Sequence, residues 1–376
     1  MEEHGFRWDV ANYQYAMLKI MREGVHQFPP SMRTFDLRHL LYVTKRSHLT
    51  DPRDRIFAVL AVAHPEARAA IRPDYHKSVE DVFREAVIYM LEVEKSLDMY
   101  AFAPLERQSR TTTPSWVPNF DIIQGDSLHG RPGNQMIDED TFVPHRGEDV
   151  RISDCGKKLV MRCLFLDQIR TIVATPDRGS PVQGFCFDVA TDSVDSINCG
   201  LALSSIKQQF NNCVERLGSA CSAEPLWKLL MLSGTGRAEW KFQPGADWSE
   251  KCEKMLATAG ELSNARGTGA YWRQRRKFNS FVRSVNAAVP LSLYILRFCL
   301  WRRRFFAGAS GWYGIAEGDV MEGDYLALIF PDTNLPFVIR RKVDCFEMVG
   351  LACIPQDMRS RVAVARSAEF QTITIQ

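Results

Sequence analysis

Two short charged segments hold the side chains best suited to chemistry, and the first is Asp51-Pro52-Arg53-Asp54. In a functional interpretation, Arg53 contacts an anion and Asp54 acts as an acid or base. In a structural interpretation, Asp51 caps a helix that begins at Pro52, Asp54 reaches back to that cap, and the arginines pair with acids such as Asp74. Acids at a helix start are favoured by the helix dipole without any catalytic need, so we prefer the structural interpretation.

The second segment is Asp74-Tyr75-His76, which can be interpreted as a His–Asp pair with a tyrosine donor. A single histidine just ahead of a helix cap at Ser78 is more often a solvated or packed side chain. The chain contains no Gly-x-Ser-x-Gly elbow, and residues 234–236 (Gly-Thr-Gly) lack the rest of a nucleotide-binding pattern and are predicted to form a turn. No catalytic residue is assigned, and the balance favours a protein that is not an enzyme.

The cysteines and histidines are separated along the chain. All ten cysteines lie at or after Cys155, and all eight histidines lie at or before His145. No pair has the CxxC or CxxH spacing that zinc sites usually use. We expect reduced, half-buried thiols, with no metal and no cofactor, and Cys–His catalysis would have to bring the two halves of the chain together.

The most unusual composition lies in residues 262–316, here called the basic tract. These 55 residues include ten Lys or Arg and no Asp or Glu. Interleaved aromatic and basic residues can bind anionic lipid or nucleic acid, whereas a solvated helix face or an internal docking surface is the simpler interpretation. The anion-binding candidates are Arg273, Arg275, Arg276, Lys277, Arg302, Arg303 and Arg304.

The elements that must position these residues change in character along the chain. Apolar spacing predicts helices over residues 8–24, 35–47, 51–63, 78–92 and 201–232. The helix after Ser78 is the clearest, because Ser78 and Asp81 form a capping box and its apolar residues share one face. Alternating and β-branched residues predict strands over residues 158–173, 325–330, 336–341 and 346–354.

These elements predict an α+β fold. We expect a helical part over residues 1–103, a crossing loop over 104–154 anchored by buried Trp116, a mixed α/β part over 155–306, and a small antiparallel β-barrel-like unit over 307–376. The predicted core consists of Ile56, Phe57, Val59, Leu60, Val82, Phe83, Val87, Met90 and Trp116.

Three segments in this order also carry a family resemblance: the Asp51-Pro52-Arg53-Asp54 helix start, residues 72–79 (RPDYHKSV) and residues 114–118 (PSWVP). Together they resemble fungal heterokaryon incompatibility (HET-domain) proteins. Residues 323–324 (GD), 336–340 (PFVIR) and 348–350 (MVG) are similar to that family's terminal strands. The motif residues that the resemblance implies are Asp51, Pro52, Arg53, Asp54, Asp74, Tyr75, Ser78 and Trp116. The family's opening signature motifs do not occur, so the chain resembles the downstream part of such a protein, and we expect a truncated form.

The resemblance implies an interaction or regulatory protein with an unidentified protein partner. The alternatives are an enzyme or accessory factor in a fungal secondary-metabolite cluster, and a binder of anionic membrane or nucleic acid through the basic tract. A net charge of +2, with 45% apolar and 24% charged residues, is ordinary for a globular protein. Neither a secretory signal nor a transmembrane stretch is readable, which predicts a cytoplasmic location.

Overall fold

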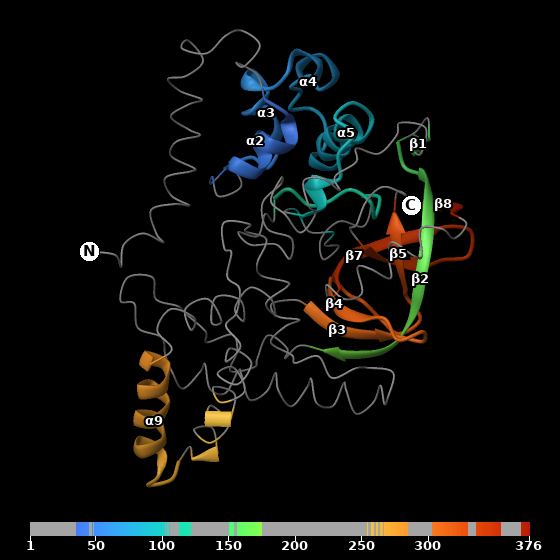
Figure 1. The fold of residues 1–376 in the computed structure, drawn as a ribbon. Coiled ribbons are helices and arrows are strands. Elements are labelled where there is room, and N and C mark those ends of the chain that lie inside the picture. The colour runs from blue at the N-terminus through green and yellow to red at the C-terminus, as the bar shows by residue number, and fades with distance from the viewer. Residues whose placement is uncertain are drawn as a thin grey trace.

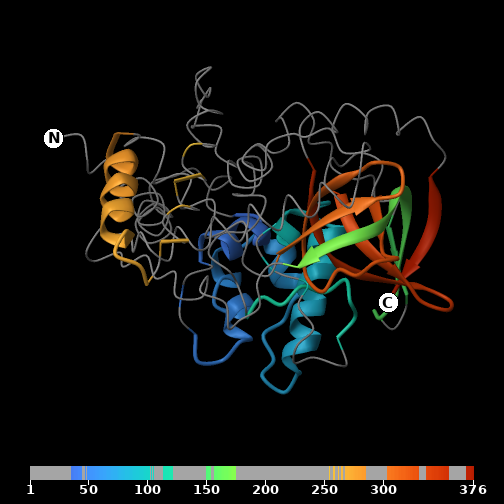
Figure 2. The same ribbon diagram turned by 90° about the horizontal axis from the view of Figure 1, so that it is seen from below.

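The protein has an α+β fold in which short helices lie beside an eight-stranded sheet (Figures 1 and 2). The computed structural model describes residues 35–44, 47, 49–101, 103, 105, 113–121, 150–153, 156–174, 254, 257–258, 261, 264–265, 267–284, 303–329, 336–354 and 370–376. The helices predicted over 8–24 and 201–232, and the turn predicted at 234–236, lie outside these residues.

Helical segments follow one another between residues 37 and 101, and one further described helix stands apart from them and from the sheet in both ribbon views (Figures 1 and 2). The segments are α2 (Leu37–Val43), α3 (Asp54–Phe57), the 3₁₀ helix η3 (Leu60–Val62), α4 (Pro65–Ala70), α5 (Val79–Glu92), the 3₁₀ helix η4 (Asp98–Ala101) and the separate α9 (Tyr271–Ser284).

Helix α5 forms where its apolar spacing predicts. Its inward face is buried from Val82 to Leu91, and Tyr89 adds to that face. Glu92 is exposed, as expected for the opposite face. Local periodicity and a side-chain cap are therefore sufficient to define this helix.

The helix predicted over residues 51–63 is wrong in its length. α3 ends at Phe57, and the chain continues with bonds from the amides of Val59 and Ala63 to carbonyls three residues back. Such bonds tighten the backbone into 3₁₀ turns. The tighter winding still buries Phe57, Leu60 and Ala63 on one side, so burial does not require a continuous α-helix here.

The predicted strands are confirmed with small shifts at their ends. Residues 158–173, 325–330, 336–341 and 346–354 correspond to β2, β5, β6 and β7. The full set is β1 (Val150–Ile152), β2 (Leu159–Ala174), β3 (Arg303–Gly308), β4 (Tyr313–Glu317), β5 (Tyr325–Ile329), β6 (Pro336–Arg341), β7 (Phe346–Cys353) and β8 (Gln371–Ile375).

Strand β2 organises the sheet. The order of paired strands is β1-β2-β3-β4-β7-β6-β5, and β2 also pairs with β5 and β8, so the path of pairings returns to β2. The β7–β8 pair is parallel, and the other pairings among the described strands are antiparallel. Register shifts occur between Phe165 and Asp167 and between Ile169 and Thr171, and such bulges bend a strand so that its two halves serve different neighbours.

Helices and sheet share one hydrophobic core. The cluster runs from Leu37 in α2 through Trp116 to Ile375 in β8. Tyr100 of η4 meets Phe337 of β6 edge to face, with ring centroids 5.4 Å apart. All nine residues predicted for the core are buried. The helical segments are thus packed on the sheet through apolar side chains.

Candidate functional site

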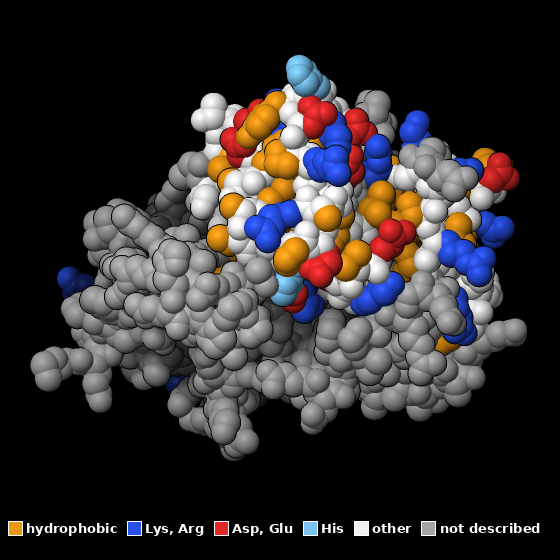
Figure 3. Space-filling model, turned by 90° about the horizontal axis from the view of Figure 1, so that it is seen from above, with side chains coloured by type: hydrophobic (Ala, Val, Ile, Leu, Met, Phe, Trp, Pro, Cys, Tyr) orange, Lys and Arg blue, Asp and Glu red, His pale blue; other side chains and the backbone are white. Residues whose placement is uncertain are grey.

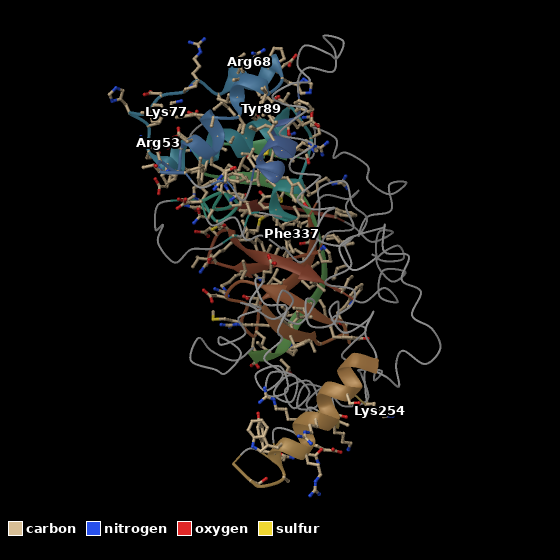
Figure 4. All side chains as sticks on the ribbon, turned by 90° about the vertical axis from the view of Figure 1, so that its left-hand side faces the viewer. Arg53, Arg68, Lys77, Tyr89, Lys254 and Phe337 are labelled. Carbon is tan, nitrogen blue, oxygen red and sulfur yellow. The ribbon has the colours of Figure 1, made fainter. Side chains whose placement is uncertain are left out.

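The two charged segments bind each other through side chains, in a cluster we call the motif latch (Asp51, Arg53, Asp54, Tyr75 and Lys77). The Arg53 guanidinium pairs with the Asp51 carboxylate at 2.6 Å and donates to the carbonyl oxygens of Lys77, at 3.0 Å, and Tyr75. It also lies 5.3 Å from the centre of the Tyr75 ring. The Tyr75 hydroxyl in turn donates to the Asp54 carboxylate. Figure 4 shows Arg53 and Lys77 near one another at the outer edge of the helices.

The latch agrees with a structural role for Asp51 and corrects three details of that interpretation. The Asp51 carboxylate accepts a hydrogen bond from the backbone amide of Arg53 at 2.9 Å, but Asp51 does not cap α3, because that helix begins at Asp54 with Arg53 in the N-cap position and no side-chain cap. Asp54 accepts from Tyr75 rather than reaching back to the cap. Arg53 pairs with Asp51, and the expected partner Asp74 instead accepts the amide of His76 at 2.8 Å.

The electrostatics of Asp51 and Tyr75 do not suit acid–base catalysis. The hydrogen bond from the Arg53 side chain lowers the pKa of Asp51, and the hydrogen bond to Asp54 raises the pKa of Tyr75. Both shifts move these groups away from neutral pH, whereas a general base or acid works best with a pKa near the working pH. His76 is exposed and belongs to a turn. The latch is therefore suited to holding residues 74–77 against α3.

Ser78 caps α5 as predicted. Its hydroxyl oxygen accepts the amide of Asp81 at 3.1 Å, and the hydroxyl donates to the Asp81 carboxylate at 2.7 Å. Arg84 also binds that carboxylate. These contacts complete the N-terminal turn of α5, the longest helix that the structure describes before β1.

Replacing Ser78 with alanine should lower the free energy of unfolding by about 1 kcal/mol, because the amide of Asp81 loses its acceptor. Urea unfolding followed by circular dichroism measures this loss. Ser78→Asn, which keeps a capping oxygen, should stay close to the original protein. An equal loss in both variants would show that the hydroxyl does not act as a cap.

Trp116 joins the helical segments to the sheet. Its side chain is fully buried, as predicted, and its indole Nε1 donates to the carbonyl of Lys157 at 3.2 Å. Its own carbonyl accepts the Tyr100 hydroxyl at 2.7 Å. The preceding Ser115 hydroxyl oxygen accepts the amide of Met348 in β7 at 3.0 Å. Residues 113–121 thus contact η4 on one side and strands of the sheet on the other.

A half-buried carboxylate, Glu94, was not identified from the sequence. It accepts the amides of Leu37 at 2.5 Å and Arg38 at 3.3 Å and so caps α2 from the end of α5. Burial raises the pKa of Glu94 to about 7, and the negative charge of Asp36 adds to the shift. The two amide bonds and the charge of Arg38 oppose it. The only sequence signal was an acid directly after an amphipathic helix, which is too common to be informative.

The raised pKa of Glu94 predicts a pH dependence of stability. Because the folded pKa of about 7 exceeds the reference value of 4.5, the favourable contribution is complete below pH 4.5 and is lost as the pH rises through 7. Glu94→Gln should abolish this slope. Between pH 5 and 8 the variant should gain up to about 3 kcal/mol relative to the original protein, since one pKa unit is worth about 1.4 kcal/mol. Urea unfolding at several pH values measures the difference, and parallel curves would refute the buried-carboxyl argument.

Two buried acids in the sheet were also missed as site residues. Asp167 accepts the amides of Gln168 at 2.8 Å, Ser310 at 2.9 Å and Trp312 at 3.3 Å, so it fixes the β3–β4 hairpin. A Cβ atom at Gly308 would lie 2.1 Å from its Oδ2, so this close approach requires glycine. The signal in the sequence was a charged residue inside an apolar strand, where burial demands partners.

The second acid is Asp324, at the start of β5. Both of its oxygens accept from the Arg340 guanidinium, at 2.8 and 3.0 Å, and Oδ2 also accepts the amide of Met321 at 2.8 Å. The side chain of Asp324 is only 3% exposed. Arg340 extends the contact to the carbonyl of Asp319. This pair secures the turn between β4 and β5.

The structure does not bring the anion-binding candidates together. Arg273, Arg275, Arg276 and Lys277 lie on α9, which stands away from β3 in both ribbon views (Figures 1 and 2). Arg304 on β3 donates to the carbonyl of Val320 at 2.7 Å, which makes it part of the sheet's internal bonding. Arg302 and the side chain of Arg303 lie outside the described residues.

The charge on α9 differs from the charge on the outer face of the helical segments. In Figure 3, acidic and basic side chains of the described residues are interspersed over that face. No helix in the part of the chain that the structure describes is long and apolar enough to cross a membrane, and no group of described residues could hold a metal ion. Comparisons with models of protein families, with curated proteins and with solved structures each find no match to this chain.

Proposed function

We propose that this protein is a non-catalytic interaction or regulatory protein related to fungal heterokaryon incompatibility proteins, acting in the cytoplasm on a protein partner. The support comes from what the resemblance motifs do in the fold. All three motif segments make contacts between elements, which favours a role in holding the fold together.

The observation that carries the proposal is the motif latch together with Trp116. The side chains of Arg53, Asp54 and Tyr75 are engaged in hydrogen bonds and an ion pair within the latch. Trp116 fills the junction between helices and sheet. Catalytic residues normally direct a reactive group at the substrate, and the pKa of that group lies close to the working pH. The latch instead lowers the pKa of Asp51 and raises that of Tyr75, so both move away from neutral pH. This favours a role in holding the fold together.

The proposal is tested by inducing this chain in a filamentous fungus together with a protein that carries the family's signature domain. The resemblance implies that signature-domain proteins arrest growth, so growth rate and viability are the readouts. We expect this chain to change the onset of arrest. Arg151→Gln, at an exposed position outside the three motif segments, should leave that change intact, whereas Trp116→Ala should reduce it because the variant is less stable. An unchanged onset with folded protein present would contradict the proposal.

A second measurement tests the alternative that the protein is an enzyme of secondary metabolism. Metabolite profiles are compared between a strain that expresses this chain and a strain in which its gene is deleted. If the chain is a regulatory protein, deleting its gene should not make one metabolite accumulate while the product of a single reaction step from that metabolite is lost. Accumulation of a single precursor with loss of its product would favour the enzyme and overturn the proposal.

We also propose that the closed path of strand pairings forms a small β-barrel-like unit. Support comes from the pairing of β2 with β5 over Cys163–Gln168, in addition to the pairing of β2 with β3. In this arrangement the bulges of β2 supply the bend that closure needs.

A further inference from the structure

Helix α9 presents an exposed face that is both aromatic and basic. Trp272 is 66% exposed, and Arg273, Arg276, Lys277 and Ser280 are exposed as well. Their spacing of one, four, five and eight residues from Trp272 places them on one side of an α-helix. The half-buried Tyr271 and Gln274 lie toward the other side.

The positive charge of this face is largely uncompensated by the described residues. Arg273 and Arg276 form no ion pair with any residue that the structure describes. Lys277 pairs with Glu261 at 2.8 Å, but both side chains are about half exposed, and such pairs are worth little and are screened by salt. Glu261 also lies just outside the acid-free residues 262–316. The face can therefore attract an anionic partner.

Trp272 is arranged as a platform for stacking. The Arg275 guanidinium lies 5.3 Å from the centre of its ring, and the Tyr271 ring meets it edge to face at 5.5 Å. These contacts hold the indole in place while most of its surface stays open to solvent. A fixed, exposed ring beside cations is the combination on which unpaired bases stack.

We propose that this face of α9 binds single-stranded nucleic acid, with Arg273, Arg276 and Lys277 contacting phosphates and Trp272 stacking on a base. A lipid surface fits less well, because the exposed face has one aromatic and no aliphatic residue among the α9 side chains that the structure describes, whereas interfacial helices bury a wide apolar face. A duplex fits less well, because its stacked bases leave no base face for Trp272. The inference does not depend on the proposed function, since α9 takes no part in the motif latch.

The experiment uses the full chain and fluorescence anisotropy with labelled 20-nucleotide strands of oligo-U and oligo-dT. Competitors are a duplex of equal length and vesicles containing phosphatidylserine. Affinity is measured between 50 and 200 mM salt. Arg273→Gln with Arg276→Gln should lower the slope of log affinity against log salt by about 1.4, since each phosphate contact of a single strand contributes about 0.7. Arg72→Gln with Arg341→Gln, which removes the same charge from exposed positions elsewhere, should leave the slope unchanged.

Variants of Trp272 separate base stacking from general charge attraction. Trp272→Ala should weaken binding by about 5- to 150-fold with the salt slope unchanged, and Trp272→Phe should retain most of the affinity. Thermal melts confirm that all variants remain folded. Tighter binding of the duplex or of the vesicles, equal losses in the control pair, or no binding at 50 mM salt would each overturn the proposal.

Discussion

Replacing Trp116 with alanine should lower the free energy of unfolding by about 3–5 kcal/mol. The side chain is fully buried within the core that helices and sheet share, so truncation leaves a cavity at their junction. It also removes the indole donor to Lys157. Urea unfolding measures the loss, and intrinsic fluorescence with circular dichroism shows whether helices and sheet unfold together.

The matched control for this variant is Trp272→Ala, because Trp272 is 66% exposed on α9. A surface truncation of this kind should change the free energy of unfolding by no more than about 0.5 kcal/mol. Similar losses in the two variants would show that Trp116 does not hold the junction.

Replacing Arg340 with methionine should cost about 3 kcal/mol or more, because Asp324 then keeps a buried charge without its partner. The amide of Met321 still donates to that carboxylate, but one neutral donor cannot replace a bidentate guanidinium. Adding Asp324→Asn to the Arg340→Met variant should recover much of the loss, since the buried charge is gone. Chemical unfolding of the single and double variants gives the coupling energy between the two residues.

The control for this pair is Lys77→Met, which breaks the pair of Lys77 with Glu85. Those side chains are about one third exposed, so the change should cost at most about 1 kcal/mol. If Arg340→Met costs no more than Lys77→Met, the Asp324–Arg340 pair does not stabilise the sheet in the way its burial suggests.

Elements whose signals are local were predictable from the sequence. Helix α5 has a side-chain cap and a continuous apolar face, and β6 is flanked in the sequence by residues typical of turns, so both lie where they were expected. α3 was predicted too long, because a run of apolar residues does not distinguish an α-helix from successive 3₁₀ turns that bury the same side chains.

Contacts between distant residues were not predictable. Nothing near Asp167 in the sequence indicates that Ser310 and Trp312 supply its donors, and nothing near Glu94 indicates that it caps α2. The burial of Trp116 could be predicted from its type and neighbours, but its contact with Lys157 could not. The basic tract was visible as composition, whereas the separation of Arg304 from α9 required the fold.

The central position of β2 has a consequence for how the chain folds during synthesis. β2 leaves the ribosome before β3–β8, and β8, which pairs with it over Leu159–Cys163, follows about 200 residues later. At translation rates of about 5–20 residues per second, an apolar strand waits roughly 10–40 s for that neighbour. The helices before it can compact meanwhile, while β2 keeps an unpaired edge open to other nascent chains. Slow translation or a shortage of chaperones should therefore lower the yield of native protein more than a change in its final stability would.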